Sequence, residues 1–169
     1  DLTENILSLS KKINSLNQII LVQKSPLNEI NAIPEIVNFE DCLLNDNDLQ
    51  FESLPFNHPL FIMYSSGTTG KPKCIIHGAG GTLLQHLKEH RLHTNIKKND
   101  RVFFFTTCGW MMWNWLVSAL ASEATIVLYE GSPFFPDPNH LWKIAEEEKI
   151  NIFGVSPRYL SSLMKEKHE

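Results

Sequence analysis

From residue 60 onward, short apolar runs alternate with longer amphipathic segments. The apolar runs lie at 60–64, 101–106, 125–129 and 150–153, and the amphipathic segments at 79–93, 111–122, 139–148 and 156–167. Runs of this length without polar alternation predict strands buried on both faces, and the longer segments predict helices. Strand–helix alternation requires crossover connections. The pattern therefore predicts an α/β fold with a mainly parallel sheet and flanking helices.

The first 57 residues are more polar and show a different pattern. Leu2, Ile6, Leu9 and Ile13 recur at helical spacing, which predicts a short amphipathic helix. The run 19–22 then predicts a buried strand, and the proline-containing stretch that follows predicts an irregular connection with one short helix at 39–44. We interpret residues 1–57 as a peripheral part of the same large domain, and residues 58–169 as an α/β subdomain.

Composition narrows the class of protein. The chain has 169 residues, of which 43% are hydrophobic and 20% charged, so its bulk is not disordered. Fifteen Lys and Arg against nineteen Asp and Glu give a net charge of -4, which argues against a nucleic-acid binder. No apolar run approaches the roughly 18 residues of a membrane span. Three cysteines without a CxxC pair favour a reducing cytoplasm over a disulfide scaffold.

The string SSGTTGKPK, residues 65–73, follows a predicted strand and carries the most informative chemistry. Its glycines allow backbone N–H groups to converge on an anion, its hydroxyls add donors, and its lysines add positive charge. The spacing is not that of a Walker A loop, which places four residues between the glycines. A loop of this composition could also be an ordinary exposed turn. The predicted phosphate contacts are Ser65, Ser66, Gly67, Thr68, Thr69, Gly70, Lys71 and Lys73.

The segment after the 101–106 strand is rich in tryptophan and methionine. Apolar residues occupy nearly every helical face, which predicts a buried helix. Core packing is the favoured role of Trp113, Trp115, Leu116 and Leu120, whereas Asn114 could contact a ligand, face the surface or cap the helix. The residues nearest the strand lie where ligands bind in open parallel sheets, and methionine suits a small apolar pocket. The predicted pocket residues are Gly109, Trp110, Met111 and Met112.

Four histidines require an interpretation. His86, His90 and His93 share one helical face, and pairs at i, i+4 can bind zinc. Because no acid or cysteine completes an obvious site, we predict no metal site and a partly exposed helix surface. His77 lies between the glycine-rich string and the next glycines, where it could contact phosphate or cap the turn.

SSGTTGKPK resembles the phosphate loop of the adenylate-forming superfamily, and the resemblance extends from about residue 52 to 169. Within the superfamily, the chain is most similar to the acetoacetyl-CoA synthetases. The matching strings are HGAGGTLLQHLKEH (77–90), GWMMWNWLVSALA (109–121) and LYEGSPFFPDPNHLW (128–142). Thr106, Thr107 and Cys108 stand where acetyl- and propionyl-CoA synthetases usually carry an Asp, which favours the acetoacetate branch.

The resemblance implies part of the large N-terminal domain of an ATP-dependent acid–thiol ligase. Such an enzyme activates acetoacetate as an acyl-adenylate and transfers it to coenzyme A, using ATP and Mg²⁺. It implies that Lys73, Thr68 and Thr69 are the leading phosphate contacts, and that Trp110 to Met112 line the acyl site. The ligand that Asn114 could contact would then be the ketone of the acid. We identify no certain catalytic residue in these 169 residues. The adenine-binding segment and the C-terminal domain are expected after residue 169, so the chain alone is expected to show no complete turnover. The alternatives are another short-chain acyl-CoA synthetase or a non-catalytic nucleotide-phosphate-binding module. The oligomeric state stays open.

Overall fold

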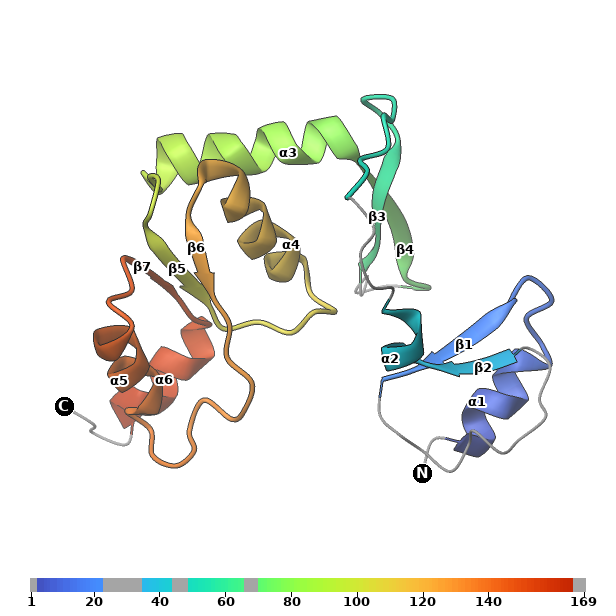
Figure 1. The fold of residues 1–169 in the computed structure, drawn as a ribbon. Helices are drawn as coiled ribbons and strands as arrows, with labels where there is room; N and C mark the ends of the chain where they lie inside the picture. Colours follow the sequence, from blue (N-terminus) through green and yellow to red (C-terminus); the bar gives the residue numbers. More distant parts are fainter. Residues whose placement is uncertain (1–2, 23–34, 44–48, 66–69, 166–169) are drawn as a thin grey trace. The chain divides into compact units, whose positions relative to one another are not determined.

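The computed structural model describes residues 3–22, 35–43, 49–65 and 70–165. The chain divides into two compact units, Asp1–Glu52 and Ser53–Glu169, which are considered separately below (Figure 1). In the part of the chain that the structure describes, no helix is long and apolar enough to cross a lipid bilayer.

The first unit combines two short helices with a pair of parallel strands. Helix α1 covers Thr3–Ser10, and strand β1, Gln18–Leu21, pairs in parallel with β2, Glu35–Asn38. Helix α2 follows directly at Phe39–Cys42. The predicted first helix and the helix near 39 are therefore confirmed, and a strand is present near 19–22. The prediction that this strand is buried is wrong, because its residues alternate between exposed and half-buried and Ile20 is 50% exposed. Strand β2 was not predicted, because its four residues, which follow Pro34 in the sequence, are too few to show a clear strand pattern.

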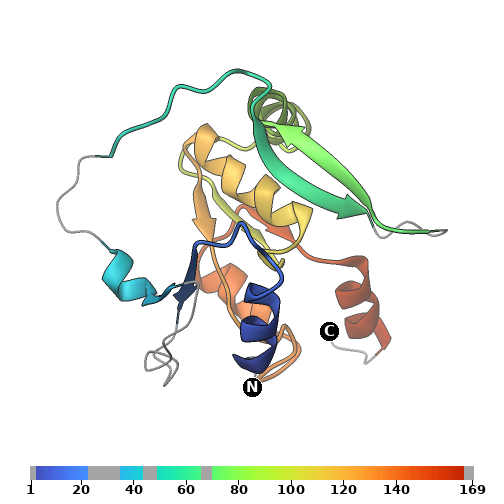
Figure 2. The same ribbon diagram turned by 90° about the vertical axis from the view of Figure 1, so that its right-hand side faces the viewer.

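The glycine-rich string connects two strands of a hairpin in the second unit. Strand β3, Pro59–Ser65, pairs antiparallel with β4, Lys73–Gly78, and Figure 2 shows the two strands side by side along their length. The expectation that the run 60–64 joins a parallel sheet is wrong. The connection between β3 and β4 is shorter than the dozen or so residues that a parallel crossover needs, so the two strands can only turn back on each other.

The remaining strands form the parallel sheet that the sequence predicts. Strand β5, Arg101–Phe104, lies in the centre, and β6, Thr125–Val127, and β7, Ile152–Gly154, flank it. Both pairs are parallel, with Val102 opposite Ile126 on one side and Ile152 on the other. The carboxyl ends of β5 and β6 thus meet at one edge, which is where open α/β sheets bind ligands.

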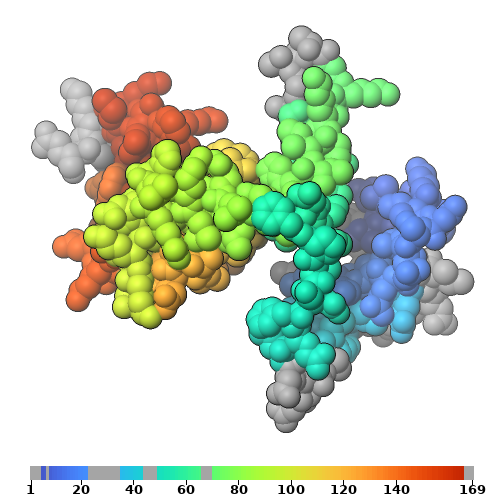
Figure 3. Space-filling view, turned by 90° about the horizontal axis from the view of Figure 1, so that it is seen from above, coloured from blue at the N-terminus to red at the C-terminus, as the bar shows by residue number. Residues whose placement is uncertain are grey.

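Helices cover both faces of this sheet, as Figure 1 shows. Helix α3, Ala79–Lys88, continues into the π-helical turn η2, Glu89–His93, and the two form one continuous surface when seen from above (Figure 3). Helix α4, Met111–Ser118, ends in the 3₁₀ turn η3, Ala119–Ser122. Helices α5, His140–Glu147, and α6, Pro157–Lys165, complete the unit.

Successive residues of β5 point to opposite faces and divide the core in two. Val102 and Phe104 pack with α4, in a cluster that includes Trp115, Leu116 and Ala119. Phe103 and Phe105 pack on the other face, in a cluster that includes Leu141 of α5 and Tyr159 and Leu163 of α6. Because both faces are covered, the strand reads as an unbroken apolar run, as a buried parallel strand should.

Gly154 on β7 permits close contact with the central strand. A Cβ atom built at Gly154 would lie 2.2 Å from Cδ2 of the Phe104 ring. We expect Gly154→Ala to displace this ring and to lower the free energy of unfolding by about 1–3 kcal/mol, the usual cost of overpacking. Urea unfolding of the 169-residue chain measures this.

Gly81→Ala provides the matched control, since Gly81 lies in α3 and a Cβ there meets nothing within 4 Å. This variant should be neutral, or up to about 1 kcal/mol more stable, because alanine favours the helix. Equal destabilisation by both substitutions would contradict the role given to Gly154.

Candidate active site

The hairpin β3–β4 presents the predicted phosphate loop at its tip. Ser65 ends β3 directly opposite Lys73, which begins β4. Gly70, Lys71 and Lys73 are exposed, and Ser65 is half-buried. Two exposed lysines beside the turn leave their charge available to an anion. Four of the predicted phosphate contacts lie outside the described residues: Ser66, Gly67, Thr68 and Thr69.

Two of the predicted acyl-pocket residues line a cavity of about 420 Å³ between α3 and α4. Met111 and Met112 form one wall of this cavity at the start of α4, and Phe104 and Trp115 contribute further apolar surface. We call it the methionine cavity. Gly109 and Trp110 are exposed and do not line it. The structure therefore brings together half of the predicted set.

Polar residues form the opposite wall of the methionine cavity: His77, Gln85, His86 and Glu89. The first lies in β4 of the hairpin, next to its last residue, and the others lie on α3 and η2. Only His77 was singled out as a site candidate from the sequence. Gln85 and Glu89 stand at i and i+4 on the predicted helix, and this spacing could have indicated that their side chains interact on one helical face.

The region near His86 is a fixed chain of hydrogen bonds. The Ser118 hydroxyl donates to the Asn114 carbonyl oxygen at 2.9 Å, and His86 Nδ1 lies 2.9 Å from Ser118 Oγ. Because the hydroxyl has one hydrogen, His86 Nδ1 must donate to it. Burial lowers the pKa of His86, with a smaller opposing effect from Glu89 and a further lowering by His77. Neutral His86 thus carries its proton on Nδ1 and leaves Nε2 as an acceptor.

Of the three histidines on the helix surface that was predicted to be partly exposed, two are buried. His86 is 7% exposed and His90 fully buried, whereas His93 is exposed. The His90 ring meets Trp115 edge-on with centroids 4.4 Å apart. Helix α4 covers the face, and periodicity alone cannot tell which element will cover it. Among the described residues, no group of three or more His, Cys, Asp or Glu is arranged to hold a metal ion.

His90 should make stability depend on pH. Burial lowers the pKa of His90, and the neighbouring His86 lowers it further, while the Trp115 backbone and Glu89 act in the opposite direction. The unfolded chain therefore takes up the proton first, near pH 6.5. We expect the free energy of unfolding to fall as the pH drops from 7.5 to 5.5, by at most about 1.4 kcal/mol per pH unit for each such histidine.

Urea unfolding of the 169-residue chain at several pH values measures this slope, and His90→Phe should reduce it. His93→Phe removes an exposed histidine from the same turn and should leave the slope unchanged. A slope that is the same in His90→Phe and in the unsubstituted chain would refute the assignment to His90.

The surface and helix-capping roles considered for Asn114 are wrong, since it lies buried inside α4, and contact with a ketone stays a prediction. Its side chain is buried, and its Nδ2 lies 3.6 Å from Sδ of Met63 in the hairpin. This contact connects α4 to β3. Of the residues predicted to be core, Trp115 and Leu116 are buried, whereas Leu120 is 52% exposed.

A second cavity, of about 630 Å³, lies at the carboxyl ends of β5 and β6. Thr106, Thr107 and Cys108 line it after β5, and residues 128–131 line it after β6. Aromatic side chains, including Phe105 and Trp113, supply much of the remaining surface. Its position is the one expected for a ligand in an open parallel sheet, although the sequence singled out the residues just beyond it.

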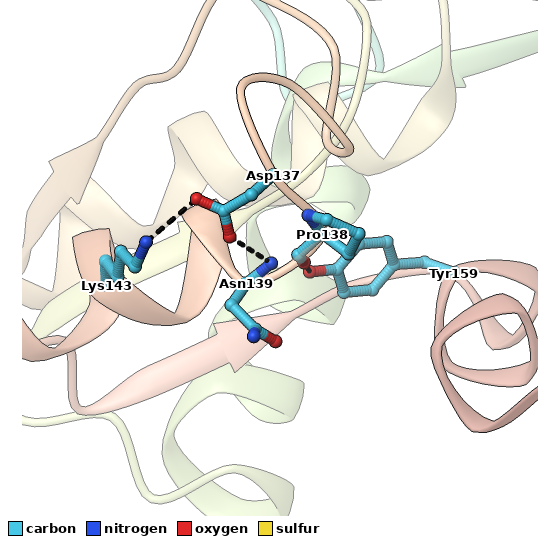
Figure 4. Close-up of polar contacts among 5 residues, drawn as sticks. All are labelled: Asp137, Pro138, Asn139, Lys143 and Tyr159. Atoms are coloured by element: carbon cyan, nitrogen blue, oxygen red, sulfur yellow. Dashed lines mark hydrogen bonds and ion pairs between the residues drawn. The ribbon is translucent and has the colours of Figure 1, made fainter. Parts of the chain in front are cut away.

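Hydrogen bonds hold the connection between β6 and α5 in place (Figure 4). Asp137 accepts from the backbone N–H of Asn139 at 2.8 Å and pairs with Lys143 Nζ at 2.8 Å. The Lys143 hydrogen bond, followed by that of Asn139, lowers the pKa of the Asp137 carboxyl. The buried Tyr159 of α6 donates its hydroxyl to the Pro138 carbonyl oxygen at 3.0 Å. These bonds fix the chain that leads away from the 630 Å³ cavity.

The geometry thus joins a cationic hairpin turn to a cavity of methionines, in one unit built on a parallel sheet. The sequence matches the AMP-binding enzyme family over residues 2–169. The chain belongs to the AMP-binding enzyme family. This agrees with the resemblance of its glycine-rich string and with its α/β fold.

Named relatives give a finer picture. The chain is 49% identical over 168 residues to the acetoacetyl-CoA synthetase of Gallus gallus, a match that covers 95% of this chain and 25% of that protein. It is 53% identical over 130 residues to the malonamoyl-CoA synthetase vrtB of Penicillium aethiopicum, covering 71% and 18%. The solved acetoacetyl-CoA synthetase from Streptomyces lividans is 40% identical with a TM-score of 0.83, covering 99% of this chain and 25% of that one. The chain therefore spans about a quarter or less of these relatives.

Proposed function

We propose that the protein containing this chain is an ATP-dependent acid–thiol ligase that converts acetoacetate into acetoacetyl-CoA. The carboxylate attacks the α-phosphorus of ATP, which forms the acyl-adenylate and expels pyrophosphate. The thiol of coenzyme A then attacks the acyl carbon and releases AMP. In this proposal, the 169 residues supply the phosphate loop and one part of the acyl pocket.

The single observation that supports this function is that the phosphate-loop hairpin and the methionine cavity share one element. Strand β4 begins at Lys73 and ends beside His77, which lines the cavity. The carboxylate of the acid must meet the α-phosphorus, so an acyl pocket has to adjoin the phosphate site. The acetoacetyl-CoA synthetases among the relatives supply the choice of acid.

The first chemical step places negative charge on the departing pyrophosphate. Donors already aimed at that charge lower the barrier, because they need no reorganisation during the reaction. Lys71, Lys73 and the Ser65 hydroxyl would provide them, together with the loop between β3 and β4. Bound Mg²⁺ would neutralise phosphate charge.

Malonamate is a second candidate acid, since the chain is also similar to a malonamoyl-CoA synthetase. Malonamate and acetoacetate have the same skeleton and carry a carbonyl on carbon 3, but they end in an amide nitrogen and a methyl group respectively. A small pocket lined by Met111 and Met112 has an apolar wall for the methyl group. That complementarity favours acetoacetate.

We propose a cytoplasmic location. Cys42, Cys74 and Cys108 are all unpaired and exposed, a state that suits a reducing compartment.

Acid-dependent exchange of labelled pyrophosphate into ATP, measured on the full-length protein, tests the proposed function. Acetoacetate, malonamate, butanoate and acetate are compared at equal concentrations. We expect acetoacetate to give the highest kcat/KM, and acetoacetyl-CoA and AMP to form when coenzyme A is added. If malonamate gives the highest value, the protein is a malonamate ligase. ATP binding without exchange for any acid would support the non-catalytic phosphate-binding module.

A further inference from the structure

The polar wall of the methionine cavity has more hydrogen-bonding capacity than an unfunctionalised acyl chain can use. Alkyl acids such as butanoate need only apolar surface beyond the carboxylate, and Met111, Met112, Phe104 and Trp115 supply it. A carbonyl on carbon 3 is different, because its oxygen is an acceptor that loses its hydrogen bonds to water on binding. Such an acid requires a donor in the pocket wall.

Two of the four polar side chains cannot donate to this oxygen in their present state. The ionised Glu89 carboxylate has acceptors only, and its Oε1 already accepts from Gln85. His86 donates through Nδ1 to Ser118, so its remaining nitrogen, Nε2, is an acceptor while the ring is neutral. Burial keeps the ring neutral.

Gln85 has a donor to spare. Its Nε2 donates one hydrogen to Glu89 Oε1 at 2.7 Å, and the amide group carries a second hydrogen on the same atom. The bond to the carboxylate also fixes which end of the amide is nitrogen, since the oxygen would be repelled there. Gln85 lines both the methionine cavity and the adjoining cavity beside Gly78 and Gly81.

His77 is the other available donor, but its place in the fold suits a different part of the acid. It lies in β4, the strand that leads from Lys73 to this cavity, whereas Gln85 and Glu89 lie on the helix that follows. In the proposed binding mode, the acid's carboxylate faces β4, since this strand connects the cavity to the phosphate loop. Carbon 3 lies two bonds farther along the acid, toward the α3 wall where Gln85 and Glu89 lie.

We propose that Gln85, oriented by Glu89, is the specificity-determining residue that donates a hydrogen bond to the carbonyl oxygen on carbon 3 of the acid. This inference rests on the proposed function and adds a reason for the choice of acid. Removing the donor leaves the carbonyl oxygen unsatisfied on binding and does nothing to an acid that has a methylene there. The discrimination between acetoacetate and butanoate should therefore depend on this one side chain.

The test is Gln85→Met in the full-length protein, because methionine has a similar length and no donor. Pyrophosphate exchange is measured with acetoacetate and with butanoate. We expect kcat/KM for acetoacetate to fall about tenfold and that for butanoate to stay within about twofold, so the ratio falls about tenfold. Glu89→Gln, which removes the charge that orients the amide, should lower the same ratio by a smaller factor.

The control is Gln18→Leu, which breaks a similar glutamine–glutamate contact, Gln18 to Glu35, in the other unit. It should leave the ratio unchanged. The inference would be overturned if Gln85→Met left the acetoacetate-to-butanoate ratio of kcat/KM unchanged, or if it lowered kcat/KM equally for both acids. The proposed function would still hold in that case, as long as the unsubstituted protein is active on acetoacetate. A change of ratio in His77→Phe with none in Gln85→Met would transfer the role to His77. Absence of acetoacetate activity in the unsubstituted protein would instead refute the proposed function.

Discussion

Replacing Lys73 with alanine in the full-length protein is expected to lower acetoacetate-dependent pyrophosphate exchange about 100-fold. That is the lower end of the loss seen when one preorganised donor to a developing negative charge is removed. Lys73 begins β4 beside the predicted phosphate loop, and its side chain is exposed. The loss should therefore appear in kcat, with little change in the thermal unfolding temperature. Steady-state exchange rates and a thermal melt of the same preparation measure both quantities.

Lys97→Ala is the matched control, since Lys97 is an exposed lysine in the connection before β5. It should keep the full exchange rate. If Lys73→Ala retains more than about a third of the unsubstituted rate, then the hairpin turn does not contact the phosphates in the way proposed. In that case, the surface-turn interpretation of the glycine-rich string would gain support.

Phe103→Ala should produce the largest loss of stability of any substitution considered. Phe103 is 1% exposed in the central strand β5, and its ring stacks on Phe153 at a centroid distance of 5.3 Å. Helices α5 and α6 close this side of the core through Leu141, Tyr159 and Leu163. Truncation removes the ring and leaves a cavity that these elements cannot fill. We expect the free energy of unfolding to fall by about 3–5 kcal/mol.

Urea unfolding of the 169-residue chain measures this effect. Phe51→Ala removes the same ring from a position that is 87% exposed and should change stability by less than about 0.5 kcal/mol. A loss below about 1 kcal/mol for Phe103→Ala would show that this half of the core is packed more loosely than the structure indicates.

The order of strands and helices in the second unit was predictable because each pattern reports on its own segment. The run at 101–106 is apolar on both faces, and β5 is indeed covered by α4 on one side and by α5 and α6 on the other. The hairpin was missed for a different reason. An apolar run gives the same signal in a parallel or an antiparallel sheet, and only the length of the connection between β3 and β4 separates the two.

The sequence pattern predicted only some of the residues that line the methionine cavity. Met111 and Met112 were predicted to line a pocket from their place after a strand, and they do line one. Gln85 and Glu89, which form the opposite wall, drew no attention as part of an amphipathic helix. Their role depends on the packing of α3 beside α4, a contact between segments distant in sequence.

The sequence by itself determined the chemistry of this chain: a string of glycines, hydroxyls and lysines suited to phosphate, and a buried α/β frame to carry it. Those properties are local, because backbone freedom, charge and periodicity belong to the residues themselves. The tertiary structure alone decided that His86 and His90 are buried rather than exposed, and that Gln85 lines a cavity together with Met111 and Met112. A helix pattern shows which residues share a face. Which element covers that face depends on how all the segments of the close-packed core fit together, and this cannot be derived from one segment.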